Sequence, residues 1–81
     1  MTEPAQTLDA RGLFCPEPVM MLHQAIAKLA PGEHLRVRAT DPTTARDIPQ
    51  FCRHLGHELL IVEESGEELV FELRKGSAGT T

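Results

Sequence analysis

The first candidate for chemistry is the thiol of Cys15, in the segment Cys15-Pro16-Glu17-Pro18. This segment directly precedes an apolar pattern of helical spacing, so we expect the sulfur at or next to the N-cap of a helix. Unpaired N–H groups and the positive end of the helix dipole favour a thiolate there, which predicts a pKa below the ordinary value of about 8.5. The alternative is a small apolar residue that closes the top of the helix. We take the nucleophile as the working hypothesis.

Four neighbours of Cys15 are predicted to support it. Pro16 suits the first position of a helix, where its missing N–H is harmless. Pro16 and Pro18 together fix two φ angles and would hold the sulfur at a rigid tip. Glu17 suits the helix dipole, but near the sulfur it would oppose a thiolate. Arg11, four residues upstream, is the candidate cation to offset Glu17.

The second cysteine, Cys52, is predicted to be structural. It lies beside Phe51 and Leu55 on the apolar stripe of a second helix. Buried cysteine behaves as a small apolar residue, and burial raises its pKa. Two cysteines 37 residues apart do not make a disulfide framework.

The histidines do not point clearly to a metal site or to a general base. Cys52, His54 and His57 could suggest metal binding, but positions i and i+2 of a helix point apart, and a second pair of ligands is missing. Solvated or capping histidines are expected, with no metal and no cofactor. His23 falls on the inner stripe of the first helix, where a partly buried structural histidine is a better interpretation than a general base. Arg46-Asp47 is either a surface ion pair or helix cap, or a contact to a partner.

Several enzyme classes are excluded by missing motifs. The chain has no Cys-x-x-Cys, no glycine-rich phosphate loop and no paired-histidine metal motif. Polar partners for a catalytic cysteine are scarce near Cys15. One exposed nucleophilic sulfur on a small scaffold suits a carrier that accepts a group and passes it on, rather than a complete enzyme.

Length and charge limit the partners. The 81 residues allow one domain, and the net charge is −4. Residues 1–57 carry six acids and six bases, so the whole charge comes from residues 58–81, with six acids and two bases. Without a basic patch, direct binding of nucleic acid is not expected. The partners are expected to be proteins or small molecules. Without a signal peptide or membrane span, we expect a cytoplasmic monomer.

The hydrophobic periodicity predicts two helices and four strands. The strands are expected at 7–10, 34–39, 58–62 and 69–73, with a hairpin turn at Ser65-Gly66, and the helices at 16–30 and up to Gly56. The second helix starts either near Asp47, with Pro49 in its first turn, or near Thr43, with Pro49 inside and a kink. Residues 6–75 are expected to form the domain, with a frayed N-terminus at 1–5 and a disordered tail at 76–81.

These elements predict an α/β fold, a two-layer βαβαββ sandwich. Alternating polarity in the strands implies one covered sheet face, with both helices on it. Right-handed crossovers then favour a four-stranded mixed sheet of order 1-2-4-3. This order places Arg36 and Arg38 opposite Glu68 and Glu72 on the open face.

The segment from Leu8 to Val19, with its Leu-Asp-x-x-Gly and Cys-Pro-x-Pro elements, resembles the signature of the TusA/SirA family of sulfur carriers. Asp41-Pro42, the stretch 46–52 and the ending Arg74-Lys75-Gly76 also match, with TusA the closest branch. The resemblance spans about residues 7–76.

The resemblance implies a two-layer sandwich and a persulfide on Cys15. It implies a cysteine desulfurase as donor, a TusBCD-type complex as acceptor and a relay ending in 2-thiouridine at the tRNA wobble position. Other branches serve sulfur oxidation, molybdenum-cofactor synthesis or selenium handling, and the motif at Cys15 does not separate them. A hypothesis of another class is a thiol-based redox or regulatory module, against which the lack of a nearby resolving cysteine weighs.

Overall fold

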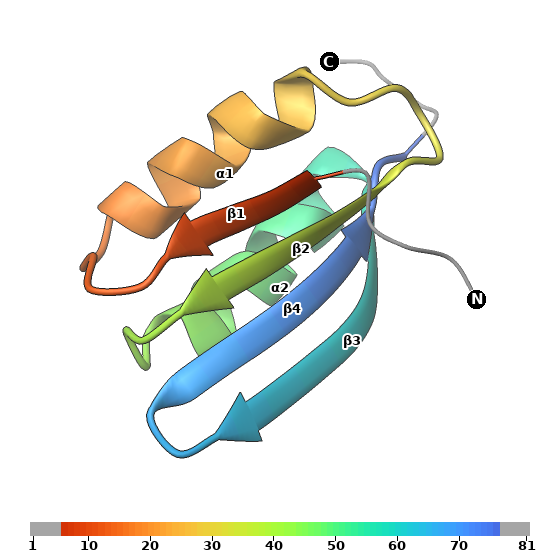
Figure 1. Ribbon diagram of the computed structural model, residues 1–81. Coiled ribbons are helices and arrows are strands. Elements are labelled where there is room, and N and C mark those ends of the chain that lie inside the picture. The colour runs from red at the N-terminus through yellow and green to blue at the C-terminus, as the bar shows by residue number, and fades with distance from the viewer. Residues whose placement is uncertain (1–5, 77–81) are drawn as a thin grey trace.

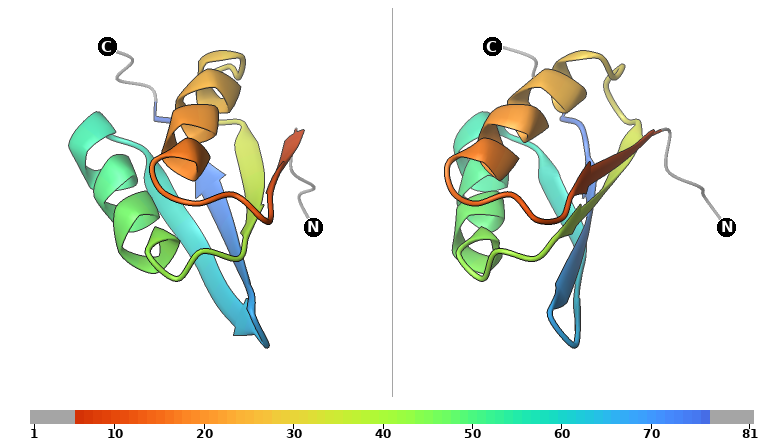
Figure 2. Two further views of the ribbon diagram at one scale, coloured as in Figure 1. Left: turned by 90° about the vertical axis from the view of Figure 1, so that its left-hand side faces the viewer. Right: turned by 60° about the vertical axis from the view of Figure 1, so that its left-hand side comes forward.

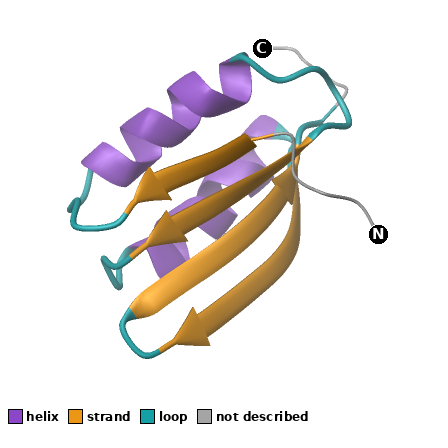
Figure 3. Cartoon of the chain, viewed as in Figure 1, coloured by secondary structure: helices purple, strands orange, loops and turns teal. Residues whose placement is uncertain are grey.

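The computed structural model describes residues 6–76. Strands and helices follow the predicted order (Figures 1 and 3). Their bounds are β1 Gln6–Ala10, α1 Glu17–Ala27, β2 His34–Ala39, α2 Thr44–Leu55, β3 Glu58–Ser65 and β4 Glu68–Arg74. The frayed end predicted for 1–5 lies outside the described residues, as does the predicted tail apart from Gly76.

The sheet has the predicted order β1-β2-β4-β3. β1 pairs with β2 in parallel, whereas β4 pairs antiparallel with both β2 and β3. Both helices cover one face of this mixed sheet and leave the other face open, as the side views in Figure 2 show. The predicted two-layer α/β sandwich is therefore confirmed.

The core lies between the sheet and the helices. The central strands β2 and β4 turn alternate apolar side chains toward it, and the two helices close it with aliphatic and aromatic ones. The buried cluster consists of Leu22, Ile26, Leu29, Leu35, Val37, Ala39, Ile48, Phe51, Cys52, Leu69, Phe71 and Leu73.

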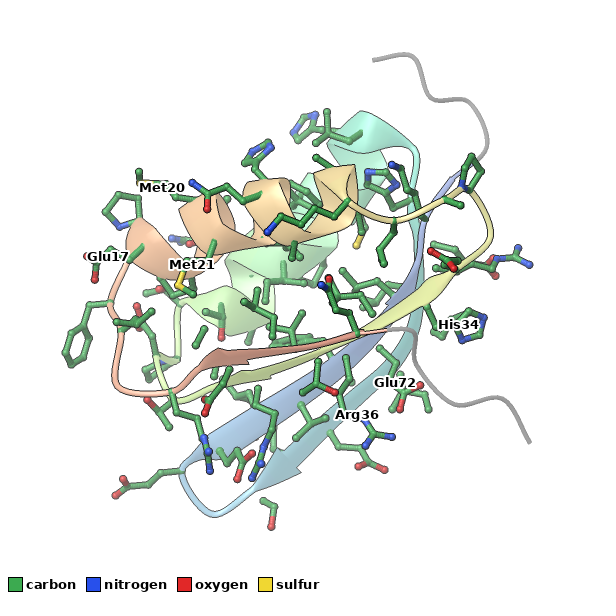
Figure 4. All side chains as sticks on the ribbon, turned by 45° about the horizontal axis from the view of Figure 1, so that its top comes forward. Glu17, Met20, Met21, His34, Arg36 and Glu72 are labelled. Carbon is green, nitrogen blue, oxygen red and sulfur yellow. The ribbon has the colours of Figure 1, made fainter. Side chains whose placement is uncertain are left out.

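The open face carries the predicted charge pairs. Arg36 donates to Glu72 at 2.7 Å, and the two side chains lie together beneath the sheet in Figure 4. Arg38 forms the second pair, with Glu68. The antiparallel register of β2 and β4 puts Arg36 directly opposite Glu72, so the sequence pattern was sufficient to predict this contact.

Helix α1 is shorter than predicted at both ends. Pro16 is the N-cap rather than the first helical residue, so α1 begins at Glu17 with Pro18 in its first turn. The helix ends at Ala27 instead of at the predicted Ala30. Lys28 and Leu29 donate to carbonyl groups three residues back, which tightens the last turn, and the Ala30 N–H is taken by the Glu33 side chain.

Helix α2 begins at Thr44, which decides between the two predicted starts. A turn at Asp41 leads directly into the helix, since Asp41 accepts hydrogen bonds from the Thr44 N–H and hydroxyl groups. Pro49 therefore lies inside the helix. Gly56 ends α2 in the left-handed conformation (φ 78°), as predicted. Leu55, expected on the buried stripe, is 46% exposed.

The β3–β4 hairpin is longer than predicted. Pairing continues past Val62 to the Ser65–Glu68 pair, so the two-residue turn is Gly66-Glu67, with Gly66 at φ 62°. The polar residues near the hairpin end join the ladder through their backbone, although their side chains are exposed.

Candidate functional site

Cys15 lies at the end of the β1–α1 loop, immediately before the N-cap of α1. Its neighbour Phe14 is 68% exposed, and Cys15 itself is exposed with a free thiol. The loop leaves β1 at Ala10, which is the register partner of Ala39 at the end of β2. Because the two strands are parallel, the chain segments that follow them meet at one edge of the sheet.

An open groove of about 380 Å³ runs from Cys15 between α1 and α2. Its walls are mainly apolar. The lining residues are Cys15, Pro16, Val19, His23, Asp47, Gln50, Phe51, His54 and Leu55. The exposure of Leu55 follows from its place on this groove rather than in the core.

The loop of Cys15 is tied to the segment that follows β2. The Gly12 N–H donates to Thr40 Oγ1 at 2.9 Å, and the Cys15 N–H donates to Asp41 Oδ2 at 2.8 Å. Asp41 Oδ1 accepts from the Thr43 N–H at 3.0 Å. Asp41 is only 5% exposed, and the hydrogen bonds from Thr43 and Cys15 lower the pKa of its carboxyl group.

The electrostatics of the thiol differ from the sequence-based expectation. The pKa of Cys15 is raised rather than lowered, first by loss of water around the sulfur and then by the carboxylates of Asp47 and Asp41. Although the residue is exposed, its sulfur borders the groove wall. Arg46 acts in the opposite direction and lowers the pKa. The helix terminus alone suggested a thiolate, but the segment that follows β2 and the first turn of α2 bring two carboxylates to the same place.

Glu17 lies in the first turn of α1, where it suits the helix dipole as expected, but neither Glu17 nor Arg11 is among the charges that shift the pKa of Cys15. Arg11 binds Asp9 instead, with hydrogen bonds of 2.9 and 2.8 Å, so its charge is engaged away from the sulfur. Glu17 stands at the exposed start of α1 (Figure 4). The acids that raise the pKa of Cys15 are Asp47 and Asp41, and the cation that lowers it is Arg46.

The two prolines of the motif have different environments. Pro16 lines the groove and forms a cis peptide bond with Cys15. Pro18 is buried beneath the first turn of α1. The Cys15 sulfur, the groove and the start of α1 therefore lie next to one another.

Arg46 and Asp47 are consecutive residues near the start of α2. They form a long ion pair, with 3.5 Å between Arg46 Nε and Asp47 Oδ1. Asp47 lines the groove, whereas the Arg46 side chain is 73% exposed. Their contact with a partner remains a prediction.

Phe51 forms the floor of the groove between two histidines. His23 meets it edge-on at 4.7 Å, and His57 stacks on it at 5.7 Å. His23 is exposed in the groove and not partly buried as expected. His57 accepts the Gly76 N–H at Nδ1. Within residues 6–76, no group of three or more His, Cys, Asp and Glu side chains is placed to hold a metal ion.

Cys52 has the predicted environment. It is 3% exposed in the core, and burial raises its pKa to about 11. The two cysteines thus differ in access, as the sequence pattern indicated. Sequence reasoning missed Thr40 and Asp41 as hydrogen-bond partners of the loop that carries Cys15. The available signal was their position directly after a strand parallel to the one that precedes the Cys15 loop.

A family model described as Sulfurtransferase TusA matches residues 6–75. The chain belongs to the TusA family. Two relatives are both named Sulfur carrier protein TusA. The one from Pseudomonas putida strain GB-1 is 57% identical over 72 residues, covering 89% of this chain and 90% of the relative. The one from Pseudomonas syringae pv. tomato is 51% identical over 83 residues, covering 95% and 99%.

A solved structure confirms the fold of this TusA family member. The crystal structure of a SirA-like protein from Desulfitobacterium hafniense superposes with a TM-score of 0.77 at 22% identity. The match covers 88% of this chain and 97% of that one. Neither helix in the described part of the chain is long and apolar enough to cross a membrane.

Proposed function

We propose that this protein carries sulfur as a persulfide on Cys15. The observation that supports this most is the exposed thiol of Cys15, held at the mouth of an apolar groove in a chain of the TusA family. Relatives matching about nine-tenths of the chain are named sulfur carrier proteins. The buried Cys52 is not accessible for the same chemistry.

The transfer step is a thiol exchange. The Cys15 thiolate attacks the terminal sulfur of a donor persulfide, the donor's S–S bond breaks, and the donor cysteine leaves as a thiolate. Cys15 then holds one additional sulfur. In the second step an acceptor thiolate attacks that terminal sulfur, and Cys15 leaves as a thiolate. No net oxidation occurs in either exchange.

The raised pKa of Cys15 affects the first step. Only the thiolate is nucleophilic, so loss of water around the sulfur, together with the carboxylates of Asp47 and Asp41, limits the attack by the free protein. The same carboxylates limit unwanted reaction of the exposed thiol with oxidants, since susceptibility follows thiolate character.

The family resemblance supplies the partners in this proposal. A cysteine desulfurase donates the sulfur, and a TusBCD-type complex accepts it in a relay toward 2-thiouridine at the tRNA wobble position. Sulfur oxidation, molybdenum-cofactor synthesis and selenium handling are the alternative routes. Measuring wobble thiouridine in a deletion strain separates the first route from the others.

The deciding experiment uses intact mass. The protein is incubated with a cysteine desulfurase and cysteine, and the mass is recorded before and after reduction. We expect a gain of sulfur that a reducing agent removes, absent in Cys15→Ser and retained in Cys52→Ser. Reducible sulfur on Cys15→Ser would show that another residue is the carrier.

A further inference from the structure

Two side chains after β2 hold the loop that carries Cys15. Thr40 Oγ1 accepts the N–H of Gly12 at 2.9 Å, and Asp41 Oδ2 accepts the N–H of Cys15 at 2.8 Å. These contacts join chain segments 28 and 26 residues apart in sequence. The start and the end of the Cys15 loop are thus each fastened by one acceptor.

Asp41 is itself fixed in place. Its other carboxylate oxygen accepts the Thr43 N–H at 3.0 Å, and its carbonyl oxygen accepts the Thr44 hydroxyl at 2.7 Å. Thr44 is the first residue of α2 and is fully buried. Asp41 therefore connects Cys15 rigidly to the start of α2, the helix that forms the second wall of the groove.

The loop needs these side-chain acceptors because its own backbone makes few hydrogen bonds. Leu13 donates to the Ala10 carbonyl at 3.3 Å, and Glu17 donates to the Phe14 carbonyl at 2.9 Å. Gly12 adopts φ 82°, in the left-handed region that glycine enters without strain. Fixing such a loop before a donor arrives removes an ordering cost from the encounter.

We propose that Thr40 and Asp41 are positioning residues for Cys15, which hold its sulfur at the mouth of the groove by accepting the N–H groups of Gly12 and Cys15. This inference rests on the proposed carrier function and deepens it. A thiolate must approach the donor's S–S bond closely and in the right direction, and displacements of about 1 Å at a reacting atom cost up to ~100-fold in rate.

Positioning can be separated from charge with three variants. Thr40→Val removes the acceptor for Gly12 and changes no charge. Asp41→Ala removes the acceptor for Cys15 together with a carboxylate. Asp47→Asn is the matched control, because Asp47 contributes a carboxylate near the sulfur but is not the acceptor of either loop N–H.

Amide hydrogen exchange, followed by NMR, tests the hold directly. We expect the Gly12 N–H to exchange about 3- to 10-fold faster in Thr40→Val, the effect of one lost hydrogen bond. In Asp41→Ala the Cys15 and Thr43 N–H groups should exchange faster. Asp47→Asn should leave all three unchanged. Unchanged exchange in a folded Thr40→Val would overturn the proposal, even if Asp41→Ala fails to fold.

The rate of sulfur transfer tests whether holding the loop speeds the reaction of Cys15. The proteins are loaded by a cysteine desulfurase with cysteine, and each is also labelled with iodoacetamide across a pH series. We expect Thr40→Val to accept sulfur about 3- to 10-fold more slowly while its labelling profile stays that of the wild type. An unaltered transfer rate would overturn the positioning role. A wild-type protein that takes up no sulfur would instead refute the carrier function, and amide exchange would still decide whether the two side chains hold the loop.

Discussion

At the scale of single residues, the environment of Cys15 is set by segments far from it in sequence. The helix N-terminus favours a thiolate, but loss of water around the sulfur and the carboxylates of Asp47 and Asp41 oppose it, and Arg46 partly offsets them. The thiol's reactivity therefore depends on how far the sulfur is shielded from water and on the balance between Arg46 and the two carboxylates of Asp41, before α2, and Asp47, within it. Removing a carboxylate should lower the pKa of Cys15, and removing the cation should raise it.

Removing the Asp47 carboxylate should lower the pKa of Cys15, because Asp47 raises it. At a pH below that pKa, Asp47→Asn then has a larger thiolate fraction and reacts faster with iodoacetamide. Arg46→Gln should do the reverse, since Arg46 lowers the pKa. The measurement is the rate of labelling against pH, followed by intact mass. Shifts of the two profiles in the same direction would contradict this account of the site.

At the scale of elements, the helix ends show what local sequence can and cannot predict. Gly56 was recognisable as a stop signal, because a left-handed C-cap at φ 78° strongly favours glycine. The end of α1 at Ala27 was not recognisable. Beyond this end, the Ala30 N–H donates to the side chain of Glu33, three residues later in the chain, instead of to a helical carbonyl group. Helical periodicity does not predict such a side-chain acceptor.

Replacing Gly56 with alanine should destabilise the protein by about 1 kcal/mol, the cost of a left-handed conformation with a Cβ atom. A Cβ placed at Gly56 meets no atom within 4 Å, so the expected loss is conformational rather than steric. The free energy of unfolding in urea measures it. The chain has no Trp and no Tyr, so far-UV circular dichroism is the appropriate signal. A stability equal to that of the wild type would indicate that α2 ends in another conformation in solution.

At the scale of the whole molecule, the topology was predictable and the site only partly so. Alternating polarity and right-handed crossovers were enough for the order β1-β2-β4-β3, and with that order came the pairing of Arg36 with Glu72. The exposed position of Cys15 directly before α1 was predictable from its local motif. The contacts of Asp41 and Asp47 with the Cys15 region are tertiary, and periodicity carries no information about which loop side chains meet.

The same topology predicts how the protein responds to acid. The hydrogen bond from Arg38 lowers the pKa of Glu68 below its ordinary value of 4.5. In the pH range between the lowered and the ordinary pKa, the unfolded state binds more protons than the folded state, so stability rises with pH there. The stabilisation by this pair is complete above about pH 4.5 and is lost as the pH falls through the lowered pKa. The pKa values of Asp9 and Asp41 are lowered too and act in the same direction.

Thermal unfolding between pH 3 and pH 7, followed by circular dichroism, tests this linkage. We expect the wild-type Tm to fall below about pH 4.5. Glu68→Gln should have a lower Tm at neutral pH and a shallower fall in acid, because it has already lost the charged pair. Its remaining acid dependence would come from Asp9 and Asp41. Glu63 on β3 provides the control, because it is exposed on the same open face of the sheet and lies outside the ion pairs of the described residues, so Glu63→Gln should keep the wild-type slope. Parallel profiles for Glu68→Gln and the wild type would show that the pair on the open face does not contribute to acid sensitivity.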